Sequence, residues 1–197
     1  MPNFTKQAIK ASFIKLLNER PLNQITVKDI VEDCGINRNS FYYHFADLPA
    51  LLEEVIMEQA DNIINEYPSA DNIINEYPSI DSMEMCMDAI ISFALKNKKA
   101  VYHIFNSVNR GMYEHYLLDM CHSFVDKYIN TTFGELPFAP YDKEIIITFY
   151  SCECFGQIIN WISGGMKADI QRQSHRLFEL RKGMIEELVK RSVESNR

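Results

Sequence analysis

The sequence predicts an all-α protein, because three of its features favour helices over strands. Apolar residues make up 47% of the 197 residues, whereas glycine and proline number only 7 each. Apolar residues recur at helical spacing, as Ile9, Phe13 and Leu17 do near the start. Glycines and prolines mark breaks between such patterns, as at residues 134–140. The expected helices, about nine in number, lie near residues 5–19, 26–33, 37–45, 47–66, 82–97, 99–107, 110–132, 142–163 and 169–193.

Residues 26–45 carry the most specific pattern in the chain. Thr26 is suited to cap a helix, with Asp29 at the third helical position of a capping box. Gly35 can take the left-handed conformation that a tight turn needs, and Asn37 repeats the capping signal. Two capped helices joined by a short turn around a glycine predict a helix-turn-helix, which presents its second helix to the major groove of DNA.

The second of these helices has a polar, aromatic-rich outer face. Phe41 and Phe45 lie four residues apart and define the buried edge, and Asn39, Ser40 and Tyr43 point most nearly away from it. The other side chains that can reach outward are Arg38, Tyr42 and His44. Hydrogen-bond donors of these kinds suit base edges and phosphates. From spacing alone, an ordinary helical hairpin whose tyrosines pack on a neighbour remains the alternative.

Over residues 5–56 the chain resembles the TetR/AcrR family of one-component transcriptional regulators. The segments that carry the likeness are TVKDI at residues 26–30, CGI at 34–36, FYYHF at 41–45 and LLEEV at 51–55. Within the family the chain is similar to the subgroup named after a dihydroxyacetone kinase regulator. The segments NRNSFYYHF and, at residues 161–167, WISGGMK carry that second likeness.

The resemblance implies two domains and a set of DNA contacts. Residues 1–46 would form a three-helix helix-turn-helix domain for DNA binding, and residues 47–197 a helical effector-binding and dimerisation domain. Base or phosphate contacts would come from Arg38, Asn39, Ser40, Tyr42, Tyr43 and His44, and backbone contacts from Thr26 and Lys28.

One departure from the family concerns the residues just after the recognition helix. Many relatives place a phosphate-clamping lysine there, whereas this chain has Asp47, Leu48 and Pro49. The sequence therefore predicts either a lower affinity for DNA or a phosphate contact supplied by Lys6 or Lys10.

The net charge of −7 is distributed unevenly along the chain. Residues 1–46 carry six Lys and Arg against four Asp and Glu, whereas the remaining residues carry 14 against 23. Such asymmetry would direct the basic end toward DNA and repel the acidic part from it. A solvated acidic face that only maintains solubility is the alternative interpretation.

The five cysteines are an odd number without a disulfide-like spacing. No signal peptide or long apolar span is evident, so we expect a cytoplasmic protein with reduced thiols. Cys152 and Cys154 are two residues apart on a predicted helix and point in opposite directions. We therefore expect them to be buried small apolar side chains, with redox sensing as a lesser hypothesis.

The decapeptide ADNIINEYPS occurs twice in succession, at residues 60–69 and 70–79. Ten residues rotate a helix by about 1000°, and Pro68 would interrupt a continuing helix. We expect the second copy to be a linker or a short helical turn. A recent duplication or a sequence error explains a perfect tandem copy better than a solenoid, which needs several repeats.

The predicted helix over residues 110–132 offers the only candidate metal spacing. His115, Asp119, His122 and Asp126 share one stripe, but that stripe lies opposite the apolar one and more simply faces water. We expect no metal and no cofactor. The sequence also lacks a glycine-rich phosphate loop and a nucleophile elbow, so an enzyme is not expected.

The family resemblance implies a ligand cavity in the second domain. Its candidate lining residues are aromatic or methionine: Phe93, Tyr102, Tyr113, Tyr116, Met120, Phe124, Tyr150 and Trp161. Such side chains suit a flat or apolar organic molecule, although the subgroup likeness would suggest a small polyol.

The last two predicted helices favour a homodimer. Residues 142–163 are apolar on every side, so a second surface must cover what the helix's own domain leaves exposed. Together with residues 169–193 the resemblance makes this a four-helix interface, with a wholly internal core as the alternative. The sequence thus predicts a repressor that binds a pseudo-palindromic operator as a dimer and is released by a small organic effector. A regulator or activator controlled by a protein partner is the second hypothesis.

Overall fold

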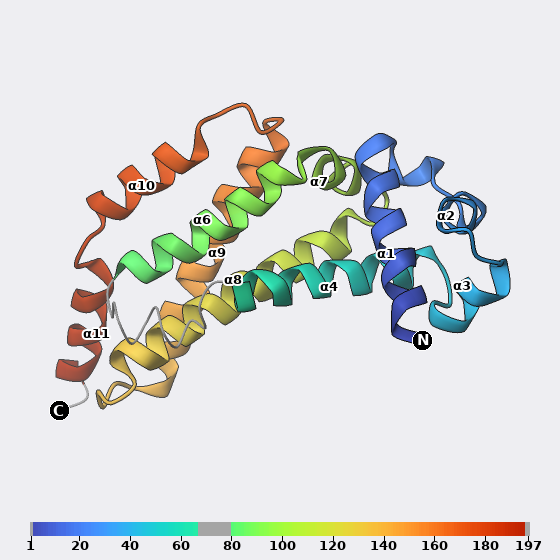
Figure 1. Cartoon of the computed structure of the whole chain (residues 1–197). Helices are drawn as coiled ribbons and strands as arrows, with labels where there is room; N and C mark the ends of the chain where they lie inside the picture. Colours follow the sequence, from blue (N-terminus) through green and yellow to red (C-terminus); the bar gives the residue numbers. More distant parts are fainter. Residues whose placement is uncertain (1, 67–79, 196–197) are drawn as a thin grey trace. The chain divides into compact units, whose positions relative to one another are not determined.

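The computed structural model describes residues 2–66 and 80–195, and it is helical as predicted (Figure 1). The second decapeptide copy, about which the sequence made a prediction, lies outside these described residues. Within them the elements are α1 (Pro2–Glu19), η1 (Leu22–Gln24), α2 (Val27–Cys34), α3 (Arg38–His44), α4 (Leu48–Glu66), α6 (Ile80–Lys96), α7 (Lys98–Phe105), α8 (Arg110–Phe133), α9 (Pro140–Ser163), α10 (Ile170–Leu180) and α11 (Met184–Ser195).

The chain forms two compact units. Unit 1 comprises Met1–Asp61 with Ala94–Tyr116, and unit 2 comprises Asn62–Phe93 with Leu117–Arg197. The core of unit 1 contains residues of α4 and α7 as well as of α1, α2 and α3. The packed unit around the helix-turn-helix is therefore larger than residues 1–46, and a functional boundary at residue 46 stays a prediction.

The core of unit 1 holds the helix-turn-helix in place. Phe13 of α1, Ile30 of α2 and Phe41 of α3 are completely buried in one cluster. The helix α1 packs against α7, α2 and α3. A polar contact joins α7 to α1, because Nδ1 of His103 lies 2.7 Å from the carbonyl oxygen of Leu17. Both segments of unit 1 thus pack against α1, which in turn contacts the recognition helix α3.

Unit 2 contains α9, which buries one side within the protein and leaves apolar side chains exposed on another, as the sequence predicts for a helix that its own domain covers only in part. Ile147 and Ile158 of α9 are buried, whereas Ile145 and Phe149 are 49% and 56% exposed. Cys154 is buried as expected, but the same prediction is wrong for Cys152, which is exposed because it lies on the outer face of the helix. By length and composition α9 could cross a membrane, although 44% of its most apolar window is buried within the protein. A single helix of this kind is weak evidence for a membrane span, because core helices of soluble proteins can have the same length and composition.

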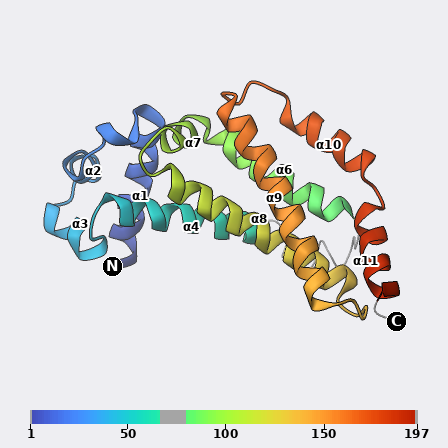
Figure 2. The ribbon, with the colours of Figure 1, turned by 180° about the vertical axis from the view of Figure 1, so that it is seen from behind.

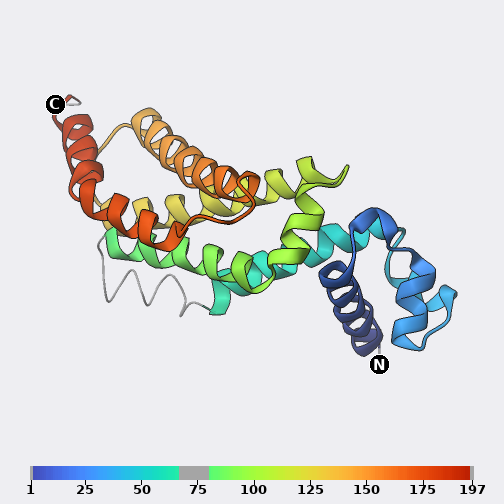
Figure 3. The same cartoon turned by 90° about the horizontal axis from the view of Figure 1, so that it is seen from above.

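The final segment is two helices, so the prediction of one helix over residues 169–193 is wrong. The chain changes direction between α10 and α11 (Figures 2 and 3). Gly183 lies in the turn with a φ of 85°, a left-handed conformation that glycine adopts without steric cost. Arg181 closes α10, with its backbone N–H bonded to the carbonyl oxygen of Leu177.

Candidate nucleic-acid interface

Both helices of the helix-turn-helix begin with the predicted caps. Thr26 Oγ1 accepts a hydrogen bond from the Asp29 N–H at 3.3 Å, and Asp29 Oδ2 accepts one from the Thr26 N–H at 2.8 Å. Asn37 Oδ1 accepts from the Ser40 N–H at 2.8 Å. Gly35 ends α2 with a φ of 67°, the left-handed conformation that the turn requires. The capping box, the turn glycine and the second cap are therefore confirmed.

The outer face of α3 is polar and accessible. Phe41 and Phe45 are 0% and 3% exposed and anchor the helix, whereas Tyr42 and Tyr43 are 46% and 78% exposed. The predicted DNA-contact residues divide by exposure: Thr26, Lys28, Arg38, Asn39, Tyr42 and Tyr43 are exposed, and Ser40 and His44 are half-buried. The predicted orientation of the helix is thus confirmed, while the individual contacts remain predictions.

Local hydrogen bonds shape this face. Arg38 Nη2 donates to the hydroxyl of Tyr42 at 3.2 Å, and the guanidinium carbon lies 5.6 Å from the centre of the same ring. Ser40 Oγ donates to Asn37 Oδ1 at 3.1 Å, so this hydroxyl also belongs to the helix cap. Arg38 and Tyr42 therefore extend from α3 as one supported pair, which lowers the entropy lost when they bind a partner.

Carboxylates neutralise most of the basic side chains around α3. Of the six Lys and Arg side chains in residues 2–46, five lie within 4.0 Å of an acid: Lys6, Lys10, Lys15, Arg20 and Lys28. Arg38 is the exception among these described residues. Its charge is therefore the one most available to a phosphate or a base edge.

The structure also bears on the predicted substitutes for the missing phosphate-clamping lysine. Lys10 Nζ lies 2.6 Å from Glu54 Oε1 and 2.8 Å from Glu58 Oε2, and its side chain is only 6% exposed. Lys6 Nζ shares Glu54 at 2.6 Å. Lys10 is thus a structural group that ties α1 to α4, and the expectation that it reaches a phosphate is wrong. Lys6 would have to leave its carboxylate to do so.

The ion pairs of Lys10 with Glu54 and Glu58 shift the pKa values of all three groups toward their charged forms. Burial lowers the pKa of Lys10, but hydrogen bonds to Glu54 and Glu58 outweigh it and leave that pKa raised above 10.5. Burial raises the pKa of Glu54, but hydrogen bonds from Lys10 and Lys6 leave it below 4.5. Hydrogen bonds from Lys10 and Gln7 lower the pKa of Glu58. All three groups are charged at neutral pH.

Asp47, which stands near the position of the family's lysine, has a structural task. Its Oδ1 accepts a hydrogen bond from the N–H of Ala50 at 2.8 Å, in the first turn of α4. An acid at a helix N-terminus is stabilised by the helix dipole as well as by this bond. Where many relatives have a phosphate-binding lysine, this chain therefore has an acid that caps α4.

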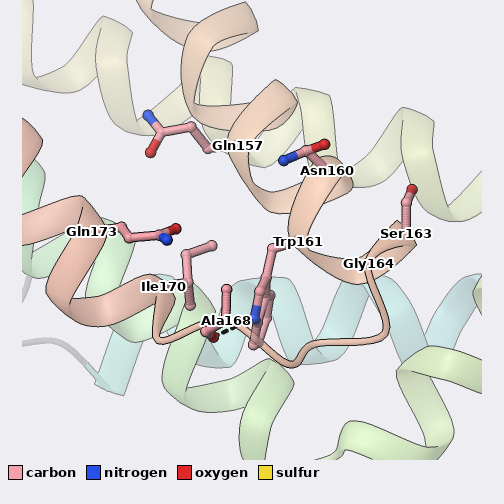
Figure 4. A pocket seen from close by; sticks show the side chains of 8 residues that line it. All are labelled: Gln157, Asn160, Trp161, Ser163, Gly164, Ala168, Ile170 and Gln173. Atoms are coloured by element: carbon pink, nitrogen blue, oxygen red, sulfur yellow. Dashed lines mark hydrogen bonds between the residues drawn. The ribbon is translucent and has the colours of Figure 1, made fainter.

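Unit 2 has a polar pocket of about 450 Å³ (Figure 4). Its lining residues are Gln157, Asn160, Trp161, Ser163, Gly164, Ala168, Ile170 and Gln173. Of the eight predicted ligand-binding residues only Trp161 lines it, with its indole N–H donating to the carbonyl oxygen of Ala168 at 3.1 Å. The amide side chains of the pocket were not predicted, because glutamine and asparagine in a helical pattern carry no specific signal.

The other predicted ligand-binding residues do not form one cluster. Tyr102, Tyr113 and Tyr116 belong to unit 1, where Tyr102 is 46% exposed and Tyr116 donates to Glu53 Oε1 at 2.5 Å. The members that lie in unit 2 are Phe93, Met120, Phe124, Tyr150 and Trp161. Ligand contacts by any of them stay predictions.

The candidate metal stripe lies at the surface of α8. His115 and Asp119 are exposed, and His122 Nε2 lies 4.0 Å from Glu144 Oε1. Within the part of the chain that the structure describes, no group of three or more His, Cys, Asp or Glu side chains could hold a metal ion.

Comparison with known proteins agrees with the class that the fold and the site define, a DNA-binding regulator. Residues 13–55 match the family model described as bacterial regulatory proteins, tetR family. Residues 81–183, more than half of the chain, match a transcriptional regulator C-terminal region of the same family. The protein therefore belongs to the TetR family of transcriptional regulators, which bind DNA through their helix-turn-helix.

Individual relatives are distant. An uncharacterised HTH-type transcriptional regulator, YxbF from Bacillus subtilis (strain 168), is 29% identical over 63 residues, which cover 32% of this chain and 17% of that protein. The structure of the dihydroxyacetone kinase operon activator DhaS is 18% identical, with a TM-score of 0.70 over 91% of this chain and 97% of that one. The fatty acid degradation regulator FadR from Bacillus halodurans is 12% identical, with a TM-score of 0.62 over 89% and 93%. At these identities the two structures share the fold.

Proposed function

We propose that this protein is a homodimeric, ligand-responsive repressor whose α3 helix reads a pseudo-palindromic operator. The observation that carries the proposal is the outer face of α3. There Arg38, Asn39 and Tyr43 are exposed, and among the described basic side chains of residues 2–46 only Arg38 lacks a nearby acid. Such side chains can contact base edges and phosphates without first breaking an ion pair.

Substitutions on α3 test this proposal in a gel-shift titration against the operator. Tyr43→Ala and Arg38→Ala should each weaken binding by about 1–3 kcal/mol, because each removes a contact made in the groove. Val108→Ala, at a side chain that is 99% exposed outside the helix-turn-helix, is the control and should bind normally. Unchanged affinity in both α3 variants, with normal melting curves, would exclude α3 as the reading helix.

An apolar stripe on α9 supports the dimer. Tyr141, Ile145, Phe149, Cys152 and Gly156 follow one face of the helix, and all are exposed. Between residues 145 and 163 the sequence has a single charged residue, Glu153, which borders this face and pairs with Arg181. Exposed apolar faces of this kind mark interaction sites. In a two-fold symmetric dimer, two copies of the same face can cover each other.

The dimer test must use the exposed stripe. Ile158 belongs to the range 142–163 that was predicted to form the interface, but it is 0% exposed within one chain, so an acid there would damage the fold itself. Phe149→Asp should instead give a folded monomer with reduced operator binding in analytical ultracentrifugation and gel shifts. Val108→Asp is the matched control. A Phe149→Asp protein that remains dimeric would place the interface elsewhere.

The pocket in unit 2 supports control by a small molecule. A volume of about 450 Å³ lies in the range of ligand sites, and the amide and hydroxyl groups of the pocket offer both donors and acceptors.

Activation of transcription is the alternative to repression, since the similar structure of DhaS is described as an operon activator. A reporter gene behind the operator, with and without the regulator, separates the two. Control by a protein partner instead of a small ligand is the alternative mechanism. We also propose that the protein acts in the cytoplasm.

A further inference from the structure

The side chain of Arg181, at the end of α10, lies against two aromatic rings inside unit 2. Its guanidinium carbon is 4.4 Å from the ring centre of Phe178 and 5.6 Å from that of Tyr150. The side chain is only 7% exposed. Because the N–H groups of a guanidinium lie in its plane, its hydrogen bonds must form at its edges.

One edge of this guanidinium is used and another is not. Arg181 Nη1 donates to Glu153 Oε2, whereas Nε and Nη2 are buried and have no partner among the described residues. The N–H groups of Nε and Nη2 are parallel and lie on the same side of an arginine. They form a fork that matches the two oxygens of a carboxylate.

Glu153 cannot serve this second edge. Its Oε2 is taken by Arg181, and its Oε1 accepts a hydrogen bond from Gln157 Nε2. Gln157 also lines the polar pocket described above (Figure 4). A continuous series of hydrogen bonds therefore runs from the pocket wall through Glu153 to the guanidinium.

One more buried polar group lies beside the guanidinium. The hydroxyl of Tyr150, whose ring centre is 5.6 Å from the guanidinium carbon and which is 1% exposed, has no partner among the described residues. Burial raises the pKa of the Tyr150 phenol, so the group keeps its proton and remains a donor. Buried polar groups are nearly always hydrogen-bonded in folded proteins, so several unsatisfied donors in one region indicate a missing acceptor.

We propose that these groups bind the carboxylate of a small organic acid. The Nε and Nη2 groups of Arg181 would hold its two oxygens, and the hydroxyl of Tyr150 would donate a further bond. The site rests on its own contacts. The effect of the acid on operator affinity rests on the proposed function.

The test measures binding of small carboxylates to the full-length protein in the absence of DNA, by calorimetry and thermal melting. The probes are acetate, butyrate and benzoate, each paired with its neutral amide. A carboxylate should bind at least about tenfold more tightly than its amide, because only the charged group uses both N–H groups of the fork.

Variants assign the binding to this cluster. Arg181→Lys keeps the charge beside Glu153 but removes the fork, so carboxylate binding should fall by about tenfold or more. Tyr150→Phe removes one hydroxyl and should weaken binding by a smaller factor. Arg172→Lys, at an exposed arginine on the same helix, should bind like the parent protein.

Three results would overturn the proposal. The first is that no carboxylate probe binds, in which case Arg181 is a structural ion pair whose second edge is hydrated. The second is equal binding of acid and amide, and the third is unchanged binding by a folded Arg181→Lys protein. If carboxylates bind as expected but α3 variants still bind the operator normally, the proposed DNA interface fails and this site stands.

Discussion

The two arginines Arg38 and Arg181 show how differently the two units use the same side chain. Arg38 is exposed on α3, has no nearby acid among the described residues, and is supported by Tyr42 four residues along the same helix. Arg181 is buried in unit 2 and pairs with Glu153, which is 28 residues away in sequence.

The two arginines differ in how far their contacts depend on long-range packing. The contacts of Arg38 form within one helix once its cap is in place, so they survive small changes elsewhere. Those of Arg181 require α9 and α10 to pack together. A charge that is removed from water is costly unless its partner is present, so the pair is sensitive to either substitution.

The largest expected effect follows from this contrast. Arg181→Ala should lower the free energy of unfolding by about 3 kcal/mol, because it removes one partner of a largely buried ion pair and leaves Glu153 beside a cavity. Arg38→Ala should change it by less than about 0.5 kcal/mol, as surface substitutions usually do. Urea denaturation measures both values. Similar losses in the two variants would show that the buried Arg181 pair contributes no more to stability than the exposed Arg38.

A smaller effect is expected at Lys10, the buried cation of unit 1. Lys10→Met should destabilise the protein by about 1–2 kcal/mol at neutral pH, because Glu54 and Glu58 would face each other without the ammonium group. Thermal melting of Lys10→Met beside Lys15→Met tests this expectation, since Lys15 is 58% exposed with one acid partner. Equal losses in the two variants would show that burial of Lys10 is unimportant.

The same cluster predicts a pH dependence. The pKa values of Glu54 and Glu58 are lowered from 4.5, so their stabilisation is complete above that pH and is lost as the pH falls below it. The raised pKa of Lys10 keeps its contribution up to about pH 10.5. In acid titrations from pH 6 to pH 3, measured by circular dichroism, Lys10→Met should lose stability less steeply than the parent protein. Parallel curves would contradict the linkage.

The cap of α2 should matter by about 1 kcal/mol. Thr26→Ala removes the hydroxyl that accepts from the Asp29 N–H, and N-cap losses of this type cost about 0.5–2 kcal/mol. Thr26→Ser, which retains the hydroxyl, is the control in the same denaturation series. A loss shared by both variants would assign the effect to the methyl group instead of the cap.

The smallest change tests the lysine that the family has and this chain lacks. Ala46 is exposed directly after α3, so Ala46→Lys adds a cation there and leaves the Asp47 cap intact. Stability should be unchanged, while the slope of log affinity against log salt should steepen by about 0.9. Filter binding at several salt concentrations measures the slope. Ala46→Gln should leave it unaltered, and no difference between the two would place residue 46 away from the phosphates.

The sequence predicted the caps and the outer face of α3 because their signals are local. Thr26 and Asp29 are three residues apart, and Phe41 and Phe45 are four apart, so helix geometry alone relates them. The lining of the pocket in unit 2 was not predictable in this way. Seven of the eight proposed lining residues do not line the pocket of unit 2, since aromatic spacing cannot tell which helices will meet.

By itself the sequence determined an all-α chain, its helix-turn-helix and its family, because hydrophobic periodicity and capping act over one or two helical turns. Only the tertiary structure decided that Lys10 is buried between two carboxylates, that Ile158 is core while Phe149 is exposed, and that Arg181 meets Glu153. These outcomes depend on which faces pack together, and many sequence-distant contacts contribute to each. Periodicity specifies the face that a helix buries but not the neighbour that buries it.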